Sequence, residues 1–121
     1  MHRIRILVDG RLAALRDAVY AAVADQADMV VVGDTVREVE TLMQAGDTSA
    51  EVVVVGASDE RLPPVVERLA DEYPGIGILV VDLERDKGFA YQLRPMVTQI
   101  DRISGPALVA AIRQLATEHD A

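Results

Sequence analysis

Short runs of apolar residues recur along the chain, separated by stretches in which apolar positions repeat every three or four residues. The runs are rich in β-branched residues, show little polar alternation, and are followed by Asp or Gly. This pattern is typical of strands buried on both faces of a parallel sheet. Four strands are therefore predicted at Ile4–Val8, Met29–Val32, Val52–Val55 and Ile78–Val81. A weaker run at Val97–Ile100 predicts a fifth strand.

The stretches between these runs have the spacing of amphipathic helices. Their apolar stripes begin at Leu12, Val36, Leu62 and Leu108; the second stripe continues through Val39, Leu42 and Met43. Between Asp82 and Ser104 the pattern favours a short helix through Phe89 and Leu93. That helix is expected to end before Pro95, because proline removes a hydrogen bond from a helix interior.

The alternation of strands and helices over 121 residues predicts one α/β domain, residues 1–121, with a doubly wound parallel sheet. Sites in such sheets lie at the carboxyl ends of the strands. The residues that follow the predicted strands are therefore where we expect any functional chemistry.

Composition narrows the function classes. The chain has no Cys, which excludes disulfides, thiolate metal sites and a Cys nucleophile. Its 20 acidic and 12 basic residues give a net charge of −8, and Lys87 is its single lysine. This balance argues against a nucleic-acid-binding or membrane-binding surface, since phosphate affinity comes from clustered Lys and Arg. No targeting signal or membrane-spanning run is evident, so a cytoplasmic protein is expected.

Several segments together resemble the receiver domains of response regulators. Ile4–Gly10 is similar to the first receiver strand with its following acidic residues, and Met29–Asp34 to the second. Ala50–Val55 resembles the third strand, and Ser104–Leu108 the start of the last helix. The resemblance implies a flavodoxin-like, receiver-like fold with five parallel strands in the order 2-1-3-4-5.

The receiver's catalytic positions are degenerate in this chain. Where receivers pair two acids that hold Mg²⁺, Asp9 fits one position and Gly10 stands at the other. Gly56 stands where the phosphorylated aspartate is expected, and Asp82 where a small hydroxylated residue is usual. Asp101, or Arg102 if the register slips by one, replaces the lysine of the fifth strand. Aspartyl phosphorylation needs a carboxylate nucleophile and cations around the phosphoryl group, so we expect a pseudo-receiver with no catalytic residue, metal or cofactor.

The resemblance also implies a protein-contact surface. In receivers the face around the fifth strand is the usual docking and dimer surface, and aromatic residues and Arg are enriched at interface hot spots. The expected partners are other proteins, including a second copy of the chain. The module would serve as an adaptor or as the N-terminal domain of a transcription regulator in two-component signalling. The corresponding residues are Phe89, Tyr91, Arg94, Gln99 and Arg102.

Two alternatives remain open from sequence. Asp9 and Asp82, with Asp59 or Asp101, supply the hard oxygen ligands of a small-molecule or divalent-metal site. The second alternative is a receiver that is phosphorylated at another residue. The two histidines, His2 and His119, lie near the termini with no fixed Ser or Asp partner, so a hydrolase triad is not expected.

Overall fold

A computed structural model describes residues 2–57, 62–92 and 98–120, with the backbone alone for Thr98 and residues 117–120. The elements alternate until β4, after which two strands follow one another directly. In chain order they are β1 (Ile4–Asp9), α1 (Ala13–Ala24), β2 (Met29–Thr35), α2 (Glu38–Asp47), β3 (Val52–Gly56), α3 (Pro64–Glu72), β4 (Gly77–Asp82), β5 (Lys87–Tyr91), β6 (Thr98–Ile100) and α4 (Gly105–Asp120).

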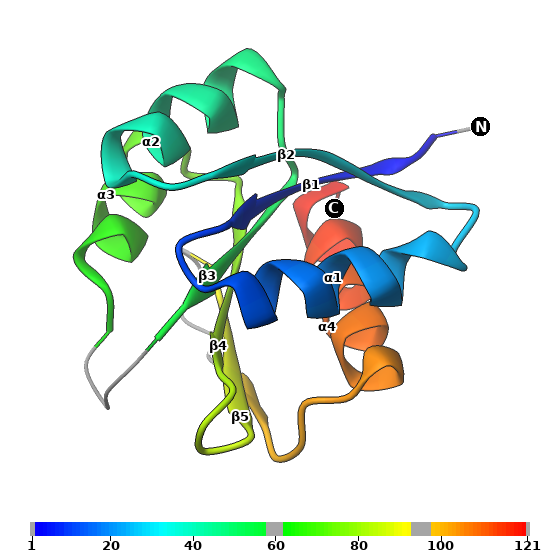
Figure 1. Ribbon diagram of the computed structural model, residues 1–121. Helices are drawn as coiled ribbons and strands as arrows, with labels where there is room; N and C mark the ends of the chain where they lie inside the picture. The colour runs from blue at the N-terminus through cyan, green and yellow to red at the C-terminus, as the bar shows by residue number, and fades with distance from the viewer. Residues whose placement is uncertain (1, 58–61, 93–97, 121) are drawn as a thin grey trace.

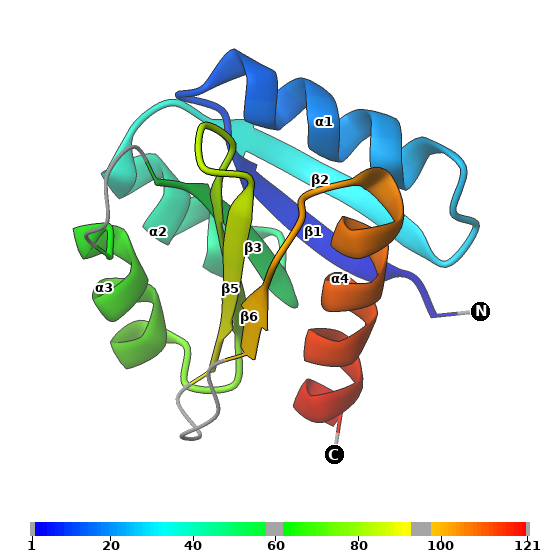
Figure 2. The same ribbon diagram turned by 90° about the horizontal axis from the view of Figure 1, so that it is seen from below.

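The strands form one mixed sheet in the order β2-β1-β3-β4-β5-β6. β2, β1, β3 and β4 are parallel, β5 is antiparallel to β4, and β6 is antiparallel to β5. Helices α1 and α4 cover one face, and α2 and α3 lie side by side on the other (Figures 1 and 2). The predicted α/β class and the first four strands are confirmed. The prediction of five strands, all parallel, is wrong.

The difference arises at β5, where the predicted helix does not form over residues 87–91. Burial alternates along this strand: Gly88 and Ala90 are buried, whereas Lys87 and Phe89 are exposed. This period of two is that of a strand. Because the inward-facing residues are small, the sequence contains no apolar run here from which the strand could be predicted. β6 runs parallel to β4, the direction predicted for the fifth strand, but β5 is inserted between them. Leu93 and Pro95 lie outside the described residues.

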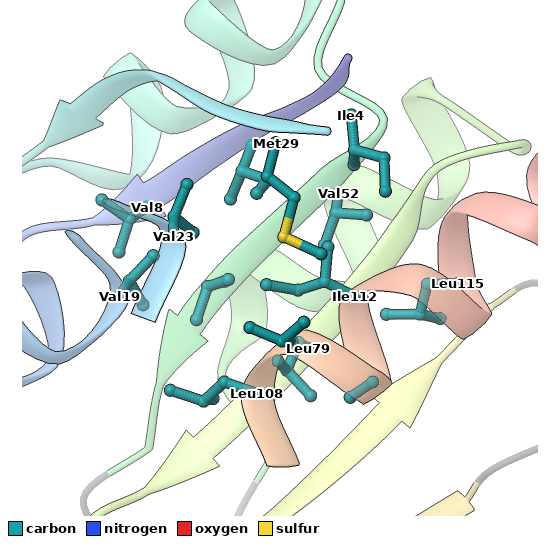
Figure 3. Packing of buried hydrophobic residues seen from close by; sticks show 14 of the residues in the cluster. Ile4, Val8, Val19, Val23, Met29, Val52, Leu79, Leu108, Ile112 and Leu115 are labelled. Carbon is teal, nitrogen blue, oxygen red and sulfur yellow. The ribbon is translucent and has the colours of Figure 1, made fainter. Parts of the chain in front are cut away.

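Two apolar clusters hold the helices on the two faces. The cluster beneath α1 and α4 includes residues of every one of the four parallel strands, and Figure 3 shows how closely its side chains pack. A Cβ at Gly77 would lie 2.8 Å from Leu115 Cβ, so α4 approaches β4 over a position where no side chain fits. On the other face, α3 buries Val65, Val66 and Leu69.

Helix α2 leaves most of the predicted apolar stripe exposed, and of that stripe Leu42 alone packs against the core. Val36, Val39 and Met43 are 59%, 57% and 62% exposed. The helix instead turns Thr41 and Ala45 inward. The Thr41 hydroxyl lies 2.6 Å from that of Thr35 in a buried hydrogen bond, which ties α2 to the end of β2. Three apolar side chains are thereby left on the outside of the molecule.

Candidate functional site

The predicted site residues Asp9, Gly56 and Asp82 end strands β1, β3 and β4 and lie at the same edge of the sheet. Gly10 follows Asp9 and is buried, with its N–H donating to the Thr35 carbonyl oxygen at 2.6 Å. Asp101 is exposed just after β6, where its carboxylate accepts a hydrogen bond of 3.2 Å from Gln99. The sequence therefore placed Asp9, Gly10, Gly56 and Asp82 correctly at this edge of the sheet. The local environment of each residue decides its chemistry.

The Asp9 carboxylate is paired with an arginine two residues further along. Asp9 is only 3% exposed. The Arg11 guanidinium donates from Nη2 to Asp9 Oδ2 at 2.6 Å and from Nε to Oδ1 at 3.0 Å. The hydrogen bond to Asp9 raises the pKa of Arg11, so the guanidinium stays charged. This pair neutralises the acid that in a receiver would face Mg²⁺.

Asp82 repeats this arrangement at the end of β4. Its Oδ2 accepts a hydrogen bond of 2.8 Å from Arg85 Nη1, and its Oδ1 accepts one of 3.1 Å from the Arg85 backbone N–H. The hydrogen bond from the Arg85 side chain, followed by those from backbone N–H groups, lowers the pKa of Asp82. Sequence reasoning missed both arginines, although each follows its aspartate by two or three residues.

Gly56 is covered by a leucine side chain. A Cβ at this position would lie 2.8 Å from Leu12 Cδ1 and 3.2 Å from Leu15 Cδ2. Leu15 is fully buried, whereas Leu12 is 42% exposed and lies over the strand end. Any side chain at position 56, an acceptor aspartate included, would have to displace Leu12. Position 56 therefore lacks the nucleophile, and the Leu12 side chain occupies the space that a side chain there would take.

A cleft of about 470 Å³ opens beside these residues at the ends of β1 and β3. Asp9, Arg11 and Gly56 form part of its lining, together with Glu38 and apolar residues from Leu62 to Val65. Glu38 is itself paired with Arg68 of α3, with 3.3 Å between Oε1 and Nη1. The described lining thus offers charges that are already matched within the protein, in a largely apolar setting.

The carboxylates predicted for a metal site do not converge. Strand β3 separates β1 from β4, which places the backbones of Asp9 and Asp82 about 10 Å apart. Within residues 2–57, 62–92 and 98–120, no group of three His, Asp or Glu side chains is arranged to hold a metal ion. Asp59 lies outside these residues. Lys87, the single lysine of the sequence, is the first residue of β5 and pairs in register with Asp82.

The predicted contact residues gather in part on one face of β5 and β6. Phe89 pairs in register with Gln99 of β6, so their side chains share a sheet face, and Tyr91 follows Phe89 by two residues. Phe89 is 38% exposed, and Tyr91 is partly buried. Arg102 is exposed beyond the end of β6, and Arg94 lies outside the described residues. The inserted strand thus presents an aromatic ring to solvent.

No helix in the described part of the chain is long and apolar enough to cross a membrane. No protein-family model matches the sequence. No curated protein matches it either. The resemblance to receiver domains therefore depends on the strand pattern, the order of the first four strands and the residues at their carboxyl ends.

Proposed function

We propose that this protein is a receiver-like regulatory module that does not undergo phosphorylation and acts through protein contacts. The single observation that carries the proposal is the exposed aromatic face of β5 and β6, with Phe89 at its centre and Tyr91 and Gln99 beside it. Exposed aromatic residues on a rigid β-sheet are typical anchors of protein interfaces. Strands β5 and β6 lie where the resemblance to receivers implies a contact surface.

The state of the strand-end carboxylates supports the non-catalytic part of the proposal. A receiver needs an accessible acid to receive the phosphoryl group and further acids to hold Mg²⁺. Here Asp9 and Asp82 are each engaged by an arginine of their own loop, and Gly56 lies beneath Leu12. A divalent cation would have to compete with a guanidinium already in place, which also weighs against the metal-binding alternative.

The partner we propose for this face is a second copy of the chain. The face carries Lys87 and also the exposed Asp101, which accepts a hydrogen bond from Gln99, so two copies that meet here have opposite charges to bring together. The apolar surface is modest, so we expect a weak dimer with a Kd on the order of 100 µM.

Sedimentation equilibrium over a wide concentration range tests this proposal. We expect the apparent mass of the wild type to rise with concentration and that of Phe89→Ser to stay at the monomer value. Leu62→Ser is a matched control, since Leu62 is 44% exposed but lies beside the cleft. Equal association of Phe89→Ser and wild type, or a wild type that stays monomeric throughout, would refute the proposed contact face.

A further inference from the structure

The α2 patch, which we define as Val36, Val39 and Met43, is the most exposed group of apolar side chains in the described chain. Each is more than half exposed. Val39 and Met43 are four residues apart on α2 and so share one face of the helix. Val36 precedes the helix by two residues. Exposed apolar side chains that share a helix face, as Val39 and Met43 do, commonly mark an interaction site.

An exposed arginine, Arg37, lies next to Val36, but acidic residues outnumber basic ones around the rest of this patch. On α2, Glu40 precedes Met43 by three residues and Asp47 follows it by four, so both flank its face. We call these two residues the acidic rim. Helix α3 lies against α2: Arg68 bonds to Glu38, and the Tyr73 hydroxyl donates to the Leu42 carbonyl oxygen at 2.7 Å. The two helices contain a single basic residue, Arg68, which is engaged in that ion pair. Their acidic residues are Glu38, Glu40, Asp47, Glu67, Asp71 and Glu72.

This combination selects one kind of occupant. We propose that the α2 patch binds a basic amphipathic helix of another protein, with the partner's apolar face on the patch and its Lys or Arg residues against the acidic rim. Apolar anchors spaced along a helix suit a helical partner, and a flexible Met adapts to its side chains. The inference rests on the proposed role in protein contacts but uses a different face of the molecule.

The charges of the rim disfavour the other occupants. A second copy would bring two acidic rims together, and like charges across an interface cost affinity. An anionic membrane surface would be repelled for the same reason. A partner of opposite charge avoids this repulsion and associates with the patch faster.

Fluorescence anisotropy with a labelled helical peptide tests the inference. The probe is a peptide of about 15 residues built from Leu and Lys, with Leu at three- and four-residue spacing. A scrambled peptide of the same composition controls for charge alone. We expect the patterned peptide to bind at least about tenfold more tightly than the scrambled one, and more weakly as salt rises.

Variants locate the binding. Val39→Ser with Met43→Gln is expected to weaken binding at least about tenfold, as is Glu40→Lys with Asp47→Lys, which reverses the rim charge without touching apolar residues. Phe89→Ser should leave peptide binding unchanged, so this surface and the proposed dimer face fail or hold separately. All these side chains are exposed, and unchanged thermal unfolding checks that each variant folds.

Three results would overturn the inference. The first is equal binding of the scrambled peptide or none of the patterned one. The second is full binding by the Val39→Ser, Met43→Gln variant. The third is wild-type self-association that this same variant abolishes, which would show that a second copy covers the patch.

Discussion

Replacing Arg11 by Met tests the account of the strand-end site. The change removes the guanidinium from the buried Asp9 carboxylate, which has no other side-chain partner within the described residues. Met keeps an unbranched side chain of comparable length, so the change removes charge and hydrogen bonds more than packing. Asp9 retains only the Arg11 backbone N–H, at 3.2 Å.

The expected loss follows from burial. Breaking a fully buried ion pair costs about 3–5 kcal/mol, whereas an exposed pair contributes about 0–1 kcal/mol. The Arg11 side chain is 44% exposed and the Asp9 side chain 4%, so an intermediate loss of about 2 kcal/mol at pH 7 is expected. For a domain of this size that corresponds to a fall in Tm of about 8 °C.

Urea unfolding followed by circular dichroism measures the effect, within a double-mutant cycle. Asp9→Asn combined with Arg11→Met leaves no unpaired charge, so the double variant should be about 1 kcal/mol more stable than Arg11→Met alone. Arg3→Met, at an exposed arginine, is the matched control and should change stability by less than about 0.5 kcal/mol. An Arg11→Met loss no larger than the control's, or a double variant less stable than Arg11→Met, would refute the reasoning.

Two further predictions concern pH and packing. Arg85 lowers the folded-state pKa of Asp82, so the contribution of Asp82 to stability is present above the unfolded-state pKa of about 3.9 and is lost as pH falls through the folded-state pKa. In urea unfolding between pH 7 and pH 2, the free energy of unfolding should therefore fall less steeply with pH for Asp82→Asn than for the wild type. Parallel pH profiles of the two proteins would contradict this. Gly77→Ala should destabilise the fold by about 1–3 kcal/mol, since its Cβ would collide with Leu115. Gly33→Ala is its matched control, because the nearest atom to that Cβ lies 3.4 Å away, and equal effects of the two substitutions would argue against the close approach of α4.

The sequence predicted the four parallel strands well because a run of consecutive β-branched residues, such as Val52–Val55, is typical of a strand that is buried on both faces of a parallel sheet. It failed at β5 because the inward positions are Gly88 and Ala90, which carry almost no apolar signal. The alternation of Phe89 and Tyr91 with small residues, after a turn in which Asp86 has a positive φ of 53°, is the signal that favours a hairpin.

At the candidate site, the sequence predicted the positions of the strand ends but not the side-chain contacts around them. Strand ends are readable from sequence, so Asp9, Gly56 and Asp82 were placed correctly. Side-chain pairing was not, because nothing in the pattern says whether Arg11 turns back onto Asp9 or points to solvent. Burial of α2 was misjudged for a related reason: Val39 and Met43 have helical spacing, but the buried bond between Thr35 and Thr41 fixes a different face inward.

Intact-mass spectrometry after incubation with a small-molecule acyl phosphate donor and millimolar Mg²⁺ tests the central claim most directly, with a phosphorylatable receiver domain in the same mixture as positive control. Our account predicts that the control gains a phosphoryl group while the mass of this chain is unchanged, because its strand-end carboxylates are held by arginines and Gly56 offers no nucleophile. A phosphoryl group on this chain at Asp9, Asp82 or any other carboxylate would contradict it.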